Sequence, residues 1–334
     1  MNKQLAAMAT LVATVAGAVA LASTSSGATK APRTIAIVRG SNGYYDDVLT
    51  GAKAASAALG DQLRVETADD PETQISVIKS LIKKHVDAIA VDPTDHPKAL
   101  KPVLAQAQAA GIAALSFSGS IQGSSVSVIN EGAAAYTNAL LKALAAEMGG
   151  KGAYMVVACR PANAIVHTWL NTIESTPGQY PQMQRIGVVY GDDSGNSQET
   201  ARFTHLIKTH QGLRGLIALC PTEAYIVPQA ISKAGKVGQV FAAGDGQNCP
   251  PVDPQLATYV RQGTEELVCE GVPTKLGYAT AWAADYLAGG HTFRPGKYDV
   301  GGPVGTVHYF APNKELRVGR PLTITRANLD KYTA

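Results

Sequence analysis

Short apolar runs alternate with longer amphipathic segments along the chain from about residue 33. In the first half, apolar runs lie at residues 35–38, 63–65, 88–91, 112–115 and 126–129. Continuous apolar runs of this length are typical of strands that are buried on both faces of a parallel sheet. Helix-like segments separate them, with apolar residues at helical spacing in 73–85 and a glycine stop, Gly60, after 48–59. This order predicts an α/β fold.

The same pattern restarts after residue 130. A helix is expected over 134–148, ended by Gly149, and strands are expected at residues 154–158, 186–190, 216–219, 240–243 and 267–269. Right-handed connections between successive parallel strands make each half a doubly wound sheet. No linker rich in Pro, Gly or Ser divides the halves, so we predict two lobes joined by a hinge near residues 130–133.

The N-terminal segment, residues 1–28, has the pattern of a signal peptide and its lead-in. Lys3 precedes an apolar and small-residue run at 5–22, which ends in the cleavage-type triplet at 20–22. The alternative is a membrane anchor, but the run consists mainly of Ala, Val and Thr, which insert weakly. The first cysteine is Cys159, so a lipoprotein anchor is not expected. We expect a periplasmic or secreted protein.

Composition supports a packed core and argues against nucleic acid as a partner. Hydrophobic residues make up 46% of the chain and charged residues 16%. The net charge is 29 − 26 = +3, and no cluster of Lys or Arg provides a basic surface.

Four cysteines, Cys159, Cys220, Cys249 and Cys269, would lie in an oxidising compartment. We expect one or two disulfides, and the sequence does not choose among the three possible pairings. No CxxC spacing indicates a thioredoxin-like or zinc-ribbon site. A catalytic thiol, with Cys159 beside His167, is the alternative.

The ends of parallel strands line the crevice between two such lobes, where α/β proteins bind ligands. Asn42, Tyr44 and Tyr45 follow the first strand and combine an amide with two aromatic rings, which suits a polyol. Their alternative role is an exposed turn. Asp245, between two glycines after another strand, can accept hydroxyl hydrogen bonds or can form an Asx turn.

Charged residues at other strand ends are further candidates. Arg39 and Arg160 can donate to ligand oxygens or form a salt bridge between lobes, and Glu270 is a cleft acceptor or a hinge residue. The full set of predicted ligand-binding residues is Arg39, Asn42, Tyr44, Tyr45, Ser118, Arg160, Asn163, Thr222, Asp245 and Glu270.

Enzyme motifs are missing from the sequence. It contains no G-x-S-x-G, no G-x-G-x-x-G after a strand and no Walker A motif. Residues 192–196 have a calcium-like run of oxygens but lack the closing Glu of an EF-hand, so a polar turn is expected. We predict no catalytic residue, no metal and no cofactor.

With these motifs, the chain resembles type I periplasmic binding proteins of the ribose-binding kind. In that family an Asn and two aromatic residues clasp the sugar, matching Asn42, Tyr44 and Tyr45, and an Asp at the position of Asp245 contacts its hydroxyls. The ending at residues 317–325 and 329–332 resembles the rhamnose and autoinducer-2 binding branch. That branch has a basic residue matching Arg39 and an acid matching Glu270.

The resemblance implies a three-crossing hinge, near residues 129–132, 267–271 and 300–306. The expected N-terminal lobe is 30–130 plus 270–302, and the C-terminal lobe is 131–269 plus 303–334. Closure would capture a small sugar, polyol or autoinducer-2-like ligand and deliver it to an ABC permease powered by its ATPase. We expect a monomer that is not an enzyme. The alternatives are a sensory receptor for chemotaxis or a histidine kinase, and a secreted hydrolase.

The sequence also departs from the family. Ribose binders have Asp-Arg where this chain has Ser118 and Gly119, and they have polar residues around Ile165 and Val166. We therefore expect a smaller, less charged or partly apolar ligand.

Overall fold

The computed structural model describes residues 30–41, 43–93, 97–159, 164–175, 179–192, 194–246 and 249–333. Within these residues, Pro32–Ala334 form one compact unit. The expected signal segment lies outside the described residues. None of the described helices combines the length and the apolar character needed to cross a bilayer.

Over the described residues, the first sheet has eight strands. They are β1 (Thr34–Arg39), β2 (Gln62–Thr67), β3 (Ala88–Val91), β4 (Ala113–Phe117), β5 (Ser127–Ile129), β11 (Gly296–Gly301), β12 (Gly305–Phe310) and β13 (Glu315–Arg317). Their order is β11-β12-β13-β5-β4-β3-β1-β2. The pairs from β2 to β13 are parallel, and β12 is antiparallel to both of its neighbours.

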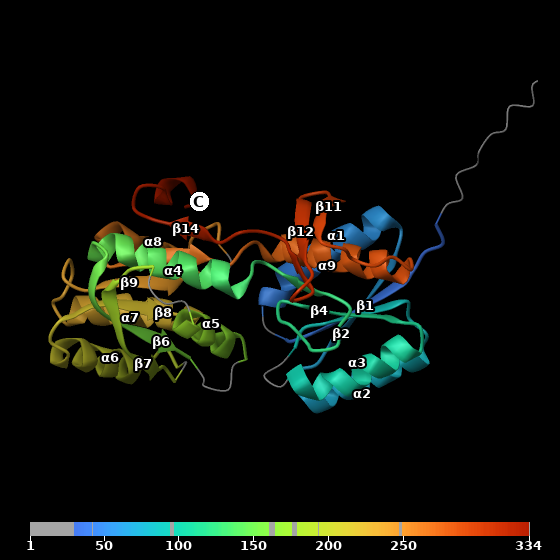
Figure 1. Ribbon diagram of the computed structural model, residues 1–334, viewed down its shortest axis with the longest axis horizontal. Helices are drawn as coiled ribbons and strands as arrows, with labels where there is room; N and C mark the ends of the chain where they lie inside the picture. Colours follow the sequence, from blue (N-terminus) through green and yellow to red (C-terminus); the bar gives the residue numbers. More distant parts are fainter. Residues whose placement is uncertain are drawn as a thin grey trace, which may run out of the picture. The chain divides into compact units, whose positions relative to one another are not determined.

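Strand β1 shows why the apolar runs are continuous. Ile35 and Ile37 pack on the side of α1 (Tyr44–Leu59) and α9 (Pro273–Ala288). Ala36 and Val38 point to the other face, where α2 (Pro71–Lys83) and α3 (Pro97–Ala109) cover the sheet. Figure 1 shows α1 and α9 on one side of the first sheet and α2 and α3 on the other. Because successive side chains alternate between faces that are both covered by helices, the four buried positions of the strand, Ile35 to Val38, are all apolar.

Helices α1 and α9 touch through their backbones. A side chain at Gly51 would begin 1.8 Å from the carbonyl oxygen of Thr274, and one at Gly277 would begin 1.8 Å from that of Val48. Only glycine permits this approach, so the two helices form one rigid layer beneath the first sheet.

The second sheet has six strands, in the order β14-β10-β9-β8-β6-β7. They are β6 (Lys151–Ala158), β7 (Gln182–Tyr190), β8 (Leu213–Ala218), β9 (Phe241–Asp245), β10 (Glu265–Cys269) and β14 (Leu322–Ile324), of which β14 is antiparallel to β10. One face packs on α4 (Ala133–Met148) and α5 (Ala164–Ser175). The other packs on α6 (Ser197–Thr209) and α7 (Pro221–Lys233), while α8 (Pro254–Gln262) joins a smaller cluster with β10. The short helix η1 (Leu329–Lys331) follows β14.

Three segments connect the two sheets, and they lie together. The chain crosses after β5, after β10 and again between β13 and β14. The amide of Gly319 in the third crossing donates to the carbonyl oxygen of Asn130 in the first, at 2.7 Å. A side chain at Gly271 in the second crossing would begin 3.1 Å from the Asn130 side chain. Asn130 is therefore the point at which all three crossings meet.

The predicted fold class, two doubly wound α/β lobes with three crossings, is confirmed. The third crossing, however, lies later in the chain than predicted, because β12 and β13 pair into the first sheet and the chain leaves it only after Arg317. Residues 303–317 therefore do not belong with the second sheet. The reason is β12, which buries Val307 and Tyr309 in the core that α1 and α9 share.

Candidate functional site

The first-lobe half of the candidate site begins at the N-terminus of α1. The Tyr44 and Tyr45 rings meet edge to face, with centroids 5.2 Å apart. The Tyr44 hydroxyl lies 3.3 Å from Ser118 Oγ, and the Tyr45 hydroxyl donates to the Asp92 carboxylate. These contacts connect the ends of three strands. The two tyrosines follow β1, Asp92 follows β3, and Ser118 follows β4. The predicted site residues Tyr44, Tyr45 and Ser118 are brought together.

Ser118 has a left-handed backbone, with φ of 58°. Such a conformation costs energy in a residue other than glycine and is found most often at functional positions. Here the amide of Ser118 donates to the carbonyl oxygen of Val128, which fixes the end of β4 against β5. The strained turn directs the Ser118 hydroxyl toward Tyr44.

The second-lobe half is built from acids. Asp245 ends β9, Glu131 follows the first crossing, Glu270 follows β10, and Tyr136 lies on the buried face of α4. Burial, followed by the charges of Asp245 and Glu131, raises the pKa of Glu270 well above its usual range. Burial and Asp245 raise the pKa of Glu131 to about 9, and burial with the same acids raises that of Tyr136. These groups therefore face one another.

The two halves are electrostatically connected. Burial raises the pKa of Tyr44, and the charges of Glu270 and Asp92 raise it further. Burial raises the pKa of Asp92 to about 7, although hydrogen bonds from Tyr45 and Ser118 lower it. At neutral pH several carboxyl groups of the site keep their protons, so they can both donate to and accept from hydroxyl groups.

A disulfide fixes two of the acid-bearing strand ends. Cys249 and Cys269 are bonded, and Cys269 directly precedes Glu270. A side chain at Gly246, next to Asp245, would begin 2.9 Å from the sulfur of Cys249. On the other side, a side chain at Gly244 would begin 2.1 Å from Glu265 Oε1. The glycines that flank Asp245 therefore make room for the protein's own groups.

The remaining predicted site residues are not all joined to this group. The Arg39 guanidinium donates to the Gly40 carbonyl oxygen at 2.9 Å and lies 3.7 Å from Asp46, which is a salt bridge within its own lobe. Thr222 lies in the first turn of α7, with its methyl group close to Gly195. Asn42, Arg160 and Asn163 lie outside the described residues.

Sequence reasoning missed three residues of the site, Asp92, Glu131 and Tyr136, and the residue at which the crossings meet, Asn130. Asp92 follows β3 and could have been chosen by the strand-end rule, but Asn130 and Glu131 lie in a crossing. Tyr136 has the helical spacing of a core residue, and it does pack on Trp169 with ring centroids 4.6 Å apart. Val166, expected to give the cleft an apolar character, is instead buried in the second-lobe core. The Ile165 side chain lies outside what is described.

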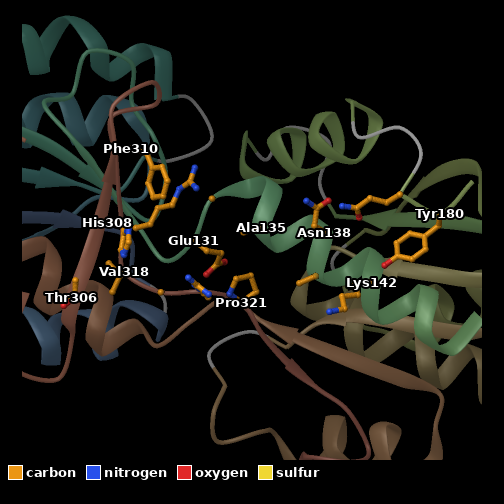
Figure 2. Close-up of a pocket in the computed structure, with 16 residues that line it drawn as sticks. Glu131, Ala135, Asn138, Lys142, Tyr180, Thr306, His308, Phe310, Val318 and Pro321 are labelled. Carbon is orange, nitrogen blue, oxygen red and sulfur yellow. The ribbon is translucent and has the colours of Figure 1, made fainter. Parts of the chain in front are cut away.

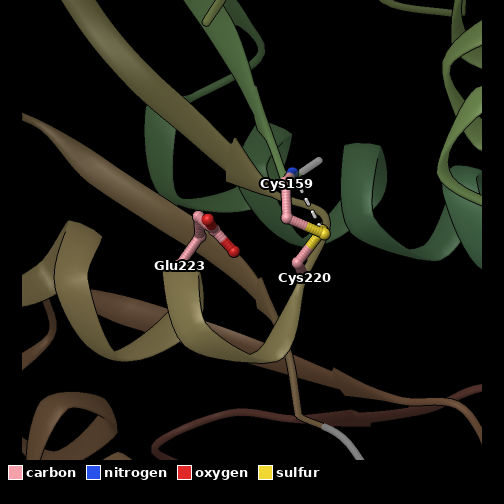
Figure 3. Close-up of side chains that lie close together, drawn as sticks. All are labelled: Cys159, Cys220 and Glu223. Atoms are coloured by element: carbon pink, nitrogen blue, oxygen red, sulfur yellow. Dashed lines mark hydrogen bonds between the residues drawn. A yellow bond between two sulfur atoms is a disulfide. The ribbon is translucent and has the colours of Figure 1, made fainter. Parts of the chain in front are cut away.

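One cluster in the second lobe has the composition of a metal site, but two of its members are joined in a disulfide. Cys159, Cys220 and Glu223 bring their ligand atoms within 4.8 Å of one another. Figure 3 shows, however, that the two sulfurs are bonded to each other. A disulfide offers neither a thiolate ligand nor a nucleophile, so the alternative with Cys159 beside His167 is wrong. Two disulfides are formed, Cys159–Cys220 and Cys249–Cys269, in agreement with the one or two that were expected, and the structure supplies the pairing that the sequence left open.

The turn before α6 is polar, as expected. Asp192 accepts from the Ser194 amide at 3.1 Å, and Asn196 caps the helix by accepting from the amides of Gln198 and Glu199. Glu199 in turn accepts from the amides of Asp192 and Gly195. The oxygens of this turn are used in capping and closing it.

Two sheets with aromatic and acidic side chains at their strand ends, joined by three crossings, define a bilobal ligand-binding protein. Residues 34–292 match the family described as periplasmic binding protein domain, and the chain belongs to this family. No curated protein matches the chain in sequence.

Solved structures share the fold at low identity. An ABC transporter solute-binding protein from Clostridium phytofermentas with bound L-rhamnose has a TM-score of 0.72 and 23% identity, covering 90% of this chain and 98% of that one. A sugar ABC transporter protein from Actinomyces odontolyticus has a TM-score of 0.74 and 21% identity, with coverage of 90% and 98%. A periplasmic solute-binding protein from Actinobacillus succinogenes with bound D-allose has a TM-score of 0.70 and 19% identity, with coverage of 90% and 100%.

Proposed function

We propose that this protein is the extracytoplasmic solute-binding component of an ABC importer, and that its ligand is a small neutral sugar or polyol. The observation that carries the proposal is the pairing of Tyr44 and Tyr45 with the acids Asp92, Asp245 and Glu270 at strand ends of both sheets. Aromatic faces cover the C–H surface of a sugar, and carboxyl groups take its hydroxyls.

The charge of the site supports a neutral ligand. Burial raises the pKa of Glu131 and of Glu270, and the charge of the neighbouring Asp245 raises both further. A sugar acid or sugar phosphate would place a second negative charge beside that of Asp245 and at a site where burial already disfavours charged carboxyl groups. The solved neighbours support the same class, since proteins of this fold are described with bound L-rhamnose, D-allose and D-arabinose.

Capture occurs by closure of the lobes about the three crossings, followed by delivery to a permease and its ATPase. The protein is exported by its N-terminal signal, acts as a monomer and returns its ligand chemically unchanged. Asp245 and Glu270 bind hydroxyl groups, Tyr44 and Tyr45 cover the ring, and Ser118 positions Tyr44.

The test is a calorimetric titration of the purified protein with L-rhamnose, D-allose, D-arabinose, D-ribose and the sugar acid D-galacturonate. A neutral sugar should bind and be recovered unchanged. At 100 times its Kd, the sugar should stabilise the protein by about 2.7 kcal/mol. Selective binding of galacturonate, or a ligand converted to product, would contradict the proposal.

A further inference from the structure

A groove with a volume of about 730 Å³ lies beside the third crossing (Figure 2). One wall is the exposed face of α4, with Ala135, Asn138, Ala139 and Lys142 at helical spacing. The opposite wall is the outward face of β12, which carries Thr306, His308 and Phe310. The chain from Arg317 to Pro321 runs between the walls, together with Glu131 and Gly132.

This groove is distinct from the proposed sugar site. Its lining includes neither the two tyrosines of α1 nor Asp245 and Glu270, and Glu131 is the residue that it shares with the acid group. Binding in this groove therefore does not depend on the proposed function.

The lining of the groove is cationic. Lys142, Arg317 and Arg320 contribute positive charge, and His308 lies opposite Arg317 in the pairing of β12 with β13. Arg317 is held by two hydrogen bonds to Glu315 Oε2, at 2.8 and 2.6 Å. Within the described part of the chain, Lys142 and Arg320 have no ion-pair partner. These two cations remain available to a ligand.

The acid in the lining does not cancel this charge. Burial and the neighbouring Asp245 raise the pKa of Glu131 to about 9, so the group is neutral at pH 7. Its Oε2 is buried and has no hydrogen-bond partner among the described residues. A neutral carboxyl group adds a donor rather than a charge.

The groove also has an apolar surface. Phe310 is 39% exposed, which is unusual for a large apolar side chain in this protein. The Arg317 guanidinium lies 4.0 Å from the centroid of the Phe310 ring and makes a cation–π contact with it. Ala135, Ala139 and Gly319 also line the groove and are small, whereas Gly132 makes room for the Arg317 guanidinium, 2.5 Å from where its side chain would begin.

We propose that this groove binds a small organic anion, whose carboxylate or phosphate group is held by Lys142 and Arg320 and whose apolar part packs on Phe310. The charge selects the anion because cations with no partner attract it most strongly at a partly enclosed surface. The exposed ring selects an organic anion over an inorganic one.

The test uses phenyl phosphate and benzoate as probes, titrated into the full protein and followed by calorimetry. The K142Q/R320Q variant should bind both probes roughly tenfold or more weakly, because a charge-assisted contact is lost. The matched control, K53Q/R294Q, removes the same charge from two exposed positions outside the groove and should leave both Kd values unchanged.

A second comparison separates the two parts of the ligand. Phe310→Ala should weaken phenyl phosphate and leave inorganic phosphate unchanged, and benzyl alcohol should bind far more weakly than benzoate. The proposal is overturned if neither probe binds the wild-type protein, or if the control variant loses as much affinity as K142Q/R320Q.

Discussion

Asp245 is the residue on which the second-lobe half of the proposed sugar site depends, because its charge raises the pKa of Glu131, Tyr136, Glu265 and Glu270. Asp245→Asn should weaken sugar binding by roughly tenfold or more, since hydrogen bonds to a charged group contribute about 1.5–3 kcal/mol. The unliganded protein should not become less stable, because one carboxylate is removed from a crowded group. Calorimetry and thermal unfolding measure the two effects.

The control for this change is Asp330→Asn, at a carboxylate whose side chain is 94% exposed. If Asp245→Asn unfolds the protein while binding by the remaining folded fraction is normal, Asp245 is a turn residue and not a ligand-binding one.

The buried acids make the stability of the unliganded protein depend on pH. The pKa of Glu131 is raised from 4.5 to about 9 and that of Asp92 from 3.8 to about 7. The folded state therefore binds these protons more tightly than the unfolded state does. Their stabilisation is complete below about pH 4 and is lost as the pH rises through the folded-state values. The unfolding free energy should fall between about pH 4 and pH 9.

Glu131→Gln tests this dependence in urea titrations at several pH values. The unfolding free energy of this variant should fall less steeply with pH than that of the wild type. The difference for one group is up to about 1.4 kcal/mol per pH unit and should be clearest from pH 7 to 9. Asp330→Asn should retain the wild-type slope. Identical slopes in wild type and Glu131→Gln would show that Glu131 ionises normally.

At the scale of elements, the contact between α1 and α9 is the most sensitive to an added atom. Gly277→Ala places a methyl group against the backbone of Val48, so the helices must separate. Overpacking of this kind costs about 1–3 kcal/mol or more. Gly187→Ala is the matched control, because its added atom would meet nothing within 4 Å. Equal unfolding midpoints for the two variants in denaturant would contradict this packing.

The two disulfides brace different parts of the second lobe. Cys159–Cys220 joins the ends of β6 and β8 across 61 residues, and Cys249–Cys269 spans 20. From loop entropy alone, replacing Cys159 and Cys220 by serine should lower the free energy of unfolding by about 4 kcal/mol, and replacing Cys249 and Cys269 should lower it by about 3 kcal/mol. Only C249S/C269S should also weaken sugar binding, because only that bond adjoins Glu270. Equal loss of binding in both double variants would remove this distinction.

Sequence periodicity predicted the strands of both sheets up to Cys269, because strands covered on two faces must be apolar throughout. It failed for β11–β14. There, one face of β12 is exposed, and Thr306, His308 and Phe310 alternate with Val307 and Tyr309. The strand-end rule likewise found Tyr44, Tyr45 and Ser118, which follow strands. It could not find Glu131 or Tyr136, whose proximity to Asp245 depends on how the crossings fold back together.

At the scale of the whole molecule, the hinge concentrates on Asn130. Gly271 has φ of 132° and lies against the Asn130 side chain. Gly271→Ala should therefore strain the second crossing and change the balance between lobe arrangements. Small-angle scattering with and without sugar should show a smaller change in radius of gyration than in the wild type. An unchanged difference would place the bending elsewhere.

The final strands have a consequence for the order in which the chain can acquire its structure during synthesis. Strand β13 fits between β5 and β12, and β14 completes the other sheet beside β10. Neither sheet can be finished until residues 315–324 have left the ribosome, although domains usually fold as soon as their own residues emerge. A nascent chain therefore remains incompletely folded for most of its translation. For the exported protein proposed above, that delay preserves the unfolded state that a translocation channel accepts.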